Sequence, residues 1–318
     1  MAQRFIKPLG TLSRRGQQLE TMKAFFKKNY KTIATIALML VGLSLLVYPL
    51  VANTWNNHVQ ATLVNNYTES VDAAIQEGTL DVEAELEKAY EYNEELLPSI
   101  LPDSFAEAEA NGTDDNYMSL LNANGDGIMG YIQIPSINVK LPIFHTTSEE
   151  VLQIGVGHLE GSSLPVGGEN THSVLSAHRG LPSATLFTDL DKVEIGDNFF
   201  VIIMGEYIAY EVDQIEVVEP DDTSLLQVEE GQDLCTLITC TPYGVNTQRL
   251  MVRGHRVEYT PDLLEDADTP LFGAVSLHTN YLLWVIVGLA IVAVFILILY
   301  IIDKKKNQKE QAIETESN

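Results

Sequence analysis

Cysteine and basic residues are both scarce in this chain of 318 residues. Only two cysteines occur, Cys235 and Cys240, which excludes the small secreted scaffolds that several disulfides hold together. Residues 53–280 contain seven Lys and Arg against 39 Asp and Glu, so their net charge is −32, compared with −25 for the whole chain. So acidic a surface repels phosphates and argues against nucleic acid as a partner, and its simplest interpretation is high solubility.

Patterns that bind metals are also lacking. His and Cys never occur at a ligand spacing such as Cys-x-x-Cys. Residues 122–127 read Asn-Ala-Asn-Gly-Asp-Gly and match the first half of a calcium loop, but the twelfth position is Gln133, which cannot supply the bidentate carboxylate. We therefore expect no metal and no cofactor, and we interpret this segment as a glycine turn that enters the first strand.

Two runs without any charge are present, residues 32–51 and residues 281–302. Each is about as long as a helix that crosses a hydrocarbon core of roughly 30 Å. Lysines precede the first run and follow the second, and basic residues stay cytoplasmic, so we expect both termini inside and residues 53–280 outside. Alternatively, the first run is a cleaved signal peptide with Ala52 near the cut, although its apolar core exceeds the usual ~7–15 residues.

The segment between the two runs changes character near residue 128. Residues 55–97 have apolar residues at helical spacing, interrupted at Gly78 and resumed after Asp81, which predicts a hairpin of two amphipathic helices. From Gly130 onward, short β-rich runs alternate with turns and predict a closed barrel or a sandwich. These runs are residues 131–134, 139–144, 173–176, 199–204, 207–218, 234–239 and 249–259.

The two cysteines are predicted to differ in their surroundings. If the intervening residues are extended, five steps of ~3.3 Å separate the two Cα atoms by more than the ~7 Å that a disulfide allows. The odd spacing also directs the side chains to opposite faces of the strand. We expect Cys235 in the core and Cys240 at the strand end, beside the turn formed by residues 241–244.

Cys240 is the candidate nucleophile of an acyl-transfer site. A thiolate is favoured by a nearby cation, and a leaving amine needs a proton that an imidazolium can give. His178 follows an apolar run and precedes a turn, which places it at another strand end, and His172 remains the alternative. If residues 241–248 connect antiparallel strands, Arg249 lies beside Cys240 and can stabilise an oxyanion; Arg253 shares its face and is the alternative.

These residues stand in motifs that resemble the sortases, the surface transpeptidases of Gram-positive bacteria. The signature consists of Thr236-Leu237-Ile238-Thr239-Cys240, Arg249, and Ser176-Ala177-His178-Arg179-Gly180-Leu181. Residues 120–122, 125–132, 164–172 and 180–187, together with the second apolar run, resemble the pilin-polymerising class C in particular. The resemblance covers about residues 85–300.

The resemblance implies a cysteine transpeptidase that needs no cofactor. Cys240 attacks the Thr-Gly bond of a Leu-Pro-x-Thr-Gly type sorting signal, His178 acts as general acid and base, and Arg249 holds the oxyanion or the substrate carbonyl. The lysine of another pilin subunit then resolves the thioester as an isopeptide bond. Class C also implies a lid over the thiol with an Asp-Pro-aromatic motif. Here Asp103 and Phe105 match, but Ser104 replaces the proline, and the alternative is an acidic loop with an incidental aromatic.

The expected fold is mainly β: a closed sortase-type barrel of about eight strands with an N-terminal helical hairpin and a lid, flanked by two transmembrane helices. The expected segments are a cytoplasmic basic tail (1–31), a transmembrane helix or signal anchor (32–51), an extracellular helical hairpin (52–97), a lid loop (98–118), the catalytic barrel (119–262), a linker (263–280), a second transmembrane helix (281–302) and a cytoplasmic tail (303–318). The leading functional prediction is pilus assembly at the cell membrane. Anchoring of surface proteins to cell-wall precursor is the alternative, and a non-enzymatic adhesin or scaffold is a distant one.

Overall fold

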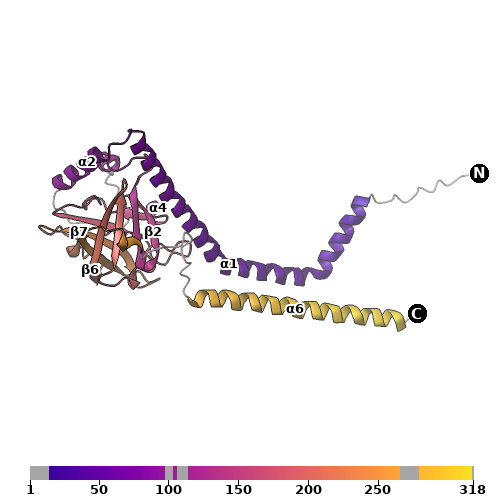
Figure 1. Ribbon diagram of the computed structural model, residues 1–318. Helices are drawn as coiled ribbons and strands as arrows, with labels where there is room; N and C mark the ends of the chain where they lie inside the picture. Colours follow the sequence, from indigo (N-terminus) through magenta and orange to yellow (C-terminus); the bar gives the residue numbers. More distant parts are fainter. Residues whose placement is uncertain (1–13, 97–102, 106–113, 266–278, 317–318) are drawn as a thin grey trace, which may run out of the picture. The chain divides into compact units, whose positions relative to one another are not determined.

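The computed structural model describes residues 14–96, 103–105, 114–265 and 279–316, and it divides into two compact units. One unit comprises residues 1–48 and 277–318, and the other comprises residues 49–276. Figure 1 shows the second unit as a barrel accompanied by helices.

The first unit is built from two apolar helices, the first part of α1 (Arg14–Gln76) and α6 (Thr279–Glu316). Both helices are long and apolar enough to cross a membrane, and their apolar side chains are largely exposed in the isolated chain. The first apolar run and the first helix of the predicted hairpin form one continuous helix, which contains Pro49. Without a backbone N–H, proline cannot form the usual helical hydrogen bond, and the two units divide at this residue.

The helical hairpin is confirmed. α1 ends at Gln76, Gly78 adopts a left-handed φ of 68°, and α2 (Val82–Glu95) begins after Asp81, whose side chain accepts a hydrogen bond from the Ala84 N–H. One face of the hairpin is buried against the barrel and contributes Val64, Tyr67, Val71 and Ala89 to the main core.

Tyr67 fastens α1 to the barrel. Its hydroxyl donates to the Met129 carbonyl at 2.8 Å and accepts from the Met204 N–H at 2.9 Å. Burial raises the pKa of Tyr67 to about 12, so the phenol stays neutral and keeps both bonds.

Eight strands close into a barrel, which confirms the predicted mainly β fold. They are β1 (Ile128–Ile134), β2 (Val139–His145), β3 (Val156–His158), β4 (Thr171–Ser176), β5 (Asn198–Ile203), β6 (Glu206–Val218), β7 (Asp233–Thr241) and β8 (Gln248–Val257). Their order around the barrel is β1-β2-β3-β4-β7-β8-β6-β5. Each of the seven predicted runs overlaps a strand, and β3 is the strand that the sequence pattern missed. It has only three residues, and its central Gly157 breaks any alternation.

Short helices occupy the connections: α3 (Asp115–Ser119), α4 (Glu149–Leu152), α5 (Asp262–Glu265), and the 3-10 turns η1 (Pro135–Ile137), η2 (Leu190–Lys192) and η3 (Ser224–Leu226).

The pairing of β4 with β7 is parallel, whereas β7 and β8 pair antiparallel. Residues opposite each other in a sheet share a face, so the strand register sorts the side chains. Leu175, Leu237 and Val252 point inward to the main core. Val174, Ile238 and Met251 form a second apolar cluster on the outer face, together with Leu159 and Leu226. We call these five residues the apolar floor of the outer face. The floor extends toward the carboxyl ends of β4 and β7.

Candidate active site

Cys240 and Arg249 face each other at one end of the outer face. Cys240 is the next-to-last residue of β7, Arg249 is the second residue of β8, and the antiparallel register pairs them directly. The spacing argument anticipated this neighbourhood. Both side chains are buried, and they lie in line with Ile238 and Met251 on the apolar floor.

His178 follows the end of β4 next to the same point. Ser176 pairs with Ile238, and the Ala177 N–H still donates to the Ile238 carbonyl at 3.2 Å. Extending this parallel register by two residues places His178 beside Cys240. The imidazole Nε2 lies 3.3 Å from a carboxylate oxygen of Glu149, which begins α4. The neighbouring strands β4, β7 and β8 thus bring an imidazole, a thiol and a guanidinium to one end of the floor. The catalytic roles of these three groups remain predictions.

The segment 103–105 covers this end. The Asp103 carboxylate accepts two hydrogen bonds from Arg249, from Nε at 2.8 Å and from Nη2 at 2.6 Å. The Phe105 ring lies 5.1 Å from the Arg249 guanidinium and 5.6 Å from the centre of the His178 ring. Ser104 is buried, and its hydroxyl has no hydrogen-bond partner among the described residues. Of the other residues predicted for the lid, 98–102 and 106–113 lie outside the described part of the chain. Residues 114–118 form the N-cap and most of helix α3.

Comparison with known proteins places this site in a family. A sortase domain matches residues 132–257. Sortase D of Bacillus subtilis is 34% identical over 131 residues, which span 40% of this chain and 63% of that protein, so the chain covers less than two thirds of this relative. The structure of sortase C-1 from Actinomyces oris is 45% identical, with a TM-score of 0.54, and covers 56% of this chain and 100% of that one. The chain belongs to the sortase family.

Its structural neighbours are class C sortases. Sortase C1 from Streptococcus agalactiae is 46% identical with a TM-score of 0.54, and the alignment covers 63% of this chain and 100% of that one. Sortase C from Streptococcus pneumoniae is 41% identical with a TM-score of 0.56, and it covers 63% and 98% of the two chains. The resemblance to class C seen in the motifs is therefore confirmed. Sortases are cysteine transpeptidases.

Burial and two neighbouring charges set the electrostatics of the thiol in this sortase. Burial raises the pKa of Cys240; the Arg249 charge lowers it, and the Asp103 charge raises it again. Burial also lowers the pKa of Arg249, but the hydrogen bond to Asp103 and the nearby Cys240 more than offset this, so its net pKa is raised. With Asp103 bound, the guanidinium is neutralised as a thiolate-stabilising charge, and the covered site favours the neutral thiol.

Arg179 connects the histidine segment to the cysteine strand. Its Nη1 donates to the Thr241 hydroxyl at 3.1 Å, its Nε donates to the Thr188 carbonyl at 3.1 Å, and its Nη2 pairs with Asp191. Thr241 directly follows Cys240, and Arg179 directly follows His178. The buried guanidinium thus ties together the backbones that carry the two candidate catalytic residues.

Arg253 and His172, the alternatives to Arg249 and His178, are both bound by residues of the barrel or its loops. Arg253 binds Asp213 through Nε at 3.0 Å and Nη2 at 2.9 Å, and its Nη1 pairs with Glu229 at 2.9 Å. His172 is buried, with Nε2 2.7 Å from the Thr236 hydroxyl and Nδ1 2.9 Å from the Gln227 carbonyl. Both residues lie at the far end of the floor from the thiol.

Cys235 is fully buried in the main core, as its position on the strand predicted, and both cysteines are free. Burial raises its pKa well above the ordinary value, with a smaller contribution from the Asp233 charge. Such a thiol packs as a small apolar group and does not compete with Cys240 as a nucleophile.

The calcium-like segment forms a turn that enters β1, as expected. The Asn122 side-chain oxygen accepts from the Gly127 N–H at 3.0 Å, and the Asp126 carboxylate accepts from the Ile128 N–H at 3.1 Å. Gly125 and Gly127 have left-handed φ angles of 71° and 82°. Two of the oxygens that a calcium loop would direct at the ion, those of Asn122 and Asp126, are here bonded to the backbone of the turn.

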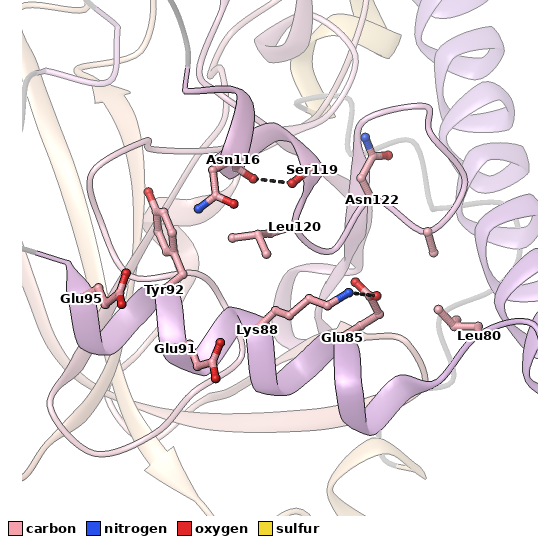
Figure 2. Close-up of a pocket in the computed structure, with 11 residues that line it drawn as sticks. Leu80, Glu85, Lys88, Glu91, Tyr92, Glu95, Asn116, Ser119, Leu120 and Asn122 are labelled. Carbon is pink, nitrogen blue, oxygen red and sulfur yellow. Dashed lines mark hydrogen bonds and ion pairs between the residues drawn. The ribbon is translucent and has the colours of Figure 1, made fainter.

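A cavity of about 530 Å³ lies between α2 and residues 116–123, away from the thiol. Figure 2 shows its acidic wall, with Glu91 and Glu95 on α2 and an ion pair between Lys88 and Glu85 at 2.5 Å. None of the candidate catalytic residues lines it.

Sequence reasoning passed over two residues near the site, Arg179 and Glu149. Arg179 belongs to the motif Ser176–Leu181, but we interpreted it only as the first residue of the turn that follows His178. Glu149 begins a helix of four residues, which is too short for periodicity to reveal.

Proposed function

We propose that this sortase cleaves Leu-Pro-x-Thr-Gly type sorting signals between Thr and Gly and joins pilin subunits through lysine isopeptide bonds. The observation that carries the proposal is the register that sets Cys240 against Arg249 while the parallel β4–β7 pairing directs His178 to the same end. The apolar floor beside them is buried and packed against Phe105, Val218 and Leu225, so it would contact the Leu-Pro part of a sorting signal only after the segment 103–105 has moved.

The acylation step follows from these side chains. Once Asp103 leaves Arg249, the guanidinium favours the Cys240 thiolate, which attacks the threonine carbonyl carbon. Arg249 then stabilises the oxyanion of the tetrahedral intermediate. Protonated His178 gives its proton to the glycine nitrogen, the C–N bond breaks, and a thioester remains on Cys240. In the second step a lysine amine attacks the thioester, and the thiolate departs.

The class of the structural neighbours supports a pilin as the substrate. Sortase C from Streptococcus pneumoniae is described in terms of its pilin substrate specificity, and one Streptococcus agalactiae neighbour is sortase C1 of a pilus island. The segment 103–105 serves as a lid, because it holds Arg249 and lies against His178 in the covered state. The two apolar helices anchor the enzyme in the cell membrane, with both termini cytoplasmic and the barrel outside.

Wall anchoring is the second candidate, because a relative named sortase A aligns with more of this chain than the class C neighbours named above do. Sortase A of Streptococcus agalactiae is 23% identical over 251 residues, which span 78% of this chain and 92% of that protein. The two candidates share the thioester and differ in the amine that resolves it, a pilin lysine or a peptidoglycan amine. A non-enzymatic scaffold would form no thioester at all.

The test uses the full chain in detergent micelles, incubated with a candidate pilin that carries a sorting signal. Covalent ladders of high mass should form with the parent enzyme and with Cys235→Ala, and Cys240→Ala should form none. A peptidoglycan-derived amine offered in the same reaction should not displace the pilin lysine. Transfer to that amine without any ladders would instead support wall anchoring.

A further inference from the structure

The second half of the proposed reaction has to recruit a lysine. At neutral pH the lysine side chain is an ammonium, with an ordinary pKa of ~10.4, and its nitrogen attacks only after it has lost a proton. A site for this amine therefore needs an ionised carboxylate, access from solvent, and a base within reach of the bound nitrogen.

Glu149 meets these requirements. Its carboxylate is held from two sides, because Oε1 accepts from the Gln153 side chain at 2.9 Å and Oε2 lies 3.3 Å from His178 Nε2. The side chain is nevertheless 68% exposed. The bond from Gln153 and the charge of His178 hold the pKa of Glu149 below its ordinary value, so the group is ionised at neutral pH.

Packing against the barrel fixes the position of Glu149. The Ser148 hydroxyl caps α4, and Leu152 at its end is buried. Below the helix, Gly157 of β3 pairs with Ser176 of β4, and a Cβ at Gly157 would come within 2.4 Å of the Thr146 carbonyl oxygen. The absent side chain lets the segment before α4 lie directly on β3, next to the strand that leads to His178.

We propose that Glu149 binds the ammonium of the acceptor lysine and presents it to the thioester on Cys240. This inference rests on the proposed isopeptide activity. It places the binding site for the acceptor lysine on the side of the active site that α4 forms. Glu149 is thus a specificity-determining residue for a cationic acceptor.

Protons and bonds balance in this step. The bound ammonium gives one proton to His178, and the free amine attacks the thioester carbonyl. A C–N bond forms as the C–S bond breaks. The amide nitrogen releases its second proton, which restores neutral Cys240, while the proton on His178 is returned to solvent or used in the next acylation. No oxidant, metal or cofactor takes part.

The test compares two nucleophiles on one acyl-enzyme. The full chain in detergent micelles is acylated with a sorting-signal peptide and then partitioned between Nα-acetyl-lysine amide, which is cationic, and hydroxylamine, which is uncharged at neutral pH. In Glu149→Gln, the ratio of the lysine rate constant to the hydroxylamine rate constant should fall about three- to fivefold, the upper range for an exposed ion pair. Glu149→Asp should recover part of the ratio.

Glu150→Gln is the matched control, because it removes the same charge from the next residue of α4 and should leave the ratio at the parent value. A ratio unchanged in Glu149→Gln overturns the proposal, even if both rate constants fall, since that pattern assigns Glu149 only to the positioning of His178. An equal fall in Glu150→Gln also overturns it, because diffuse charge would then suffice. If the parent forms a thioester but never transfers it to lysine, the pilin proposal fails together with this one; if no thioester forms, the acyl-transfer proposal itself fails.

Discussion

Arg249 and Arg253 lie four residues apart on the same face of β8, and each binds one aspartate through Nε and Nη2. Their partners differ in origin. Asp213 belongs to β6, the strand that pairs with β8, so the Arg253 pair is part of the barrel. Asp103 lies in the segment 103–105, which contributes no strand.

The difference separates an arginine that serves the fold from one that serves the site. Arg253 and Asp213 stand on paired strands that keep the two side chains next to each other, and Glu229 holds Arg253 as well. Arg249 can release Asp103 while the barrel stays intact, and the charge that it then exposes lies beside a thiol. An arginine thus belongs to the barrel at one position, and in the proposed function an arginine is available for catalysis at the other.

The largest expected effect concerns the arginines themselves. Arg249→Ala should lower the rate of sorting-peptide cleavage by about 100-fold or more, because the oxyanion loses its stabilising cation. Arg253→Ala should change this rate about twofold at most and instead reduce the free energy of unfolding by about 1 kcal/mol. Peptide cleavage followed by chromatography checks the first statement, and urea unfolding checks the second. Equal losses of activity in the two variants would break the comparison.

Next in size is the effect of the two aspartates on the thiol. The Asp103 charge raises the pKa of Cys240, so Asp103→Asn should lower that pKa and increase the thiolate fraction at neutral pH. Alkylation of Cys240 by iodoacetamide at neutral pH should therefore be faster than in the parent. Asp213→Asn is the matched control and should leave the rate unchanged. A slower reaction in Asp103→Asn would show that the segment 103–105 does not suppress the thiolate.

A smaller effect is expected from the aromatic residue of the lid. Phe105 contacts both His178 and Arg249, and its removal weakens the covered state without removing a charge. Phe105→Ala should cleave a sorting peptide a few times faster than the parent, since aromatic and cation–π contacts of this kind are each worth about 1 kcal/mol. Phe105→Leu keeps much of the apolar contact, so its cleavage rate should lie between that of the parent and that of Phe105→Ala. Cleavage no faster than the parent argues against a closing lid.

The smallest expected effect is on the pH dependence of stability. It involves His172, which lies at the same end of the apolar floor as Arg253. Burial lowers the pKa of His172 below its ordinary value of 6.5, and the Arg253 charge lowers it further, against the opposing bond to Gln227. A group with a depressed pKa in the folded state is stabilising when neutral. Its contribution is therefore complete above pH 6.5 and is lost as the pH falls below that value. The urea midpoint of His172→Gln should fall less than that of the parent between pH 7.5 and pH 5. An identical fall in both would contradict this assignment.

How far the sequence predicted the molecule depends on the range of each interaction. Gly78, Asp81 and the alternating strands act through neighbouring residues, so periodicity and turn chemistry identified the hairpin and seven strands. Arg249 was placed beside Cys240 because a hairpin joins them over a few residues. β3 was missed because three residues with a central glycine carry no pattern.

Contacts between distant segments could not be predicted in this way. Asp103 and Arg249 are 146 residues apart, and only the resemblance to class C pointed to Asp103. The pairing of Arg179 with Thr241 depends on the parallel placement of β4 beside β7, which no local pattern encodes. Glu149 likewise reaches His178 through the packing of α4 on β3.

The mass of the acyl-enzyme tests the central claim most directly. The full chain is incubated with a Leu-Pro-x-Thr-Gly peptide, trapped by acid, and analysed by intact mass and peptide mapping. We predict one added mass, that of the peptide up to its threonine, on Cys240, present in Cys235→Ala and absent in Cys240→Ala. An adduct on another residue, or cleavage of the peptide by Cys240→Ala, would contradict the assignment of Cys240 as the nucleophile.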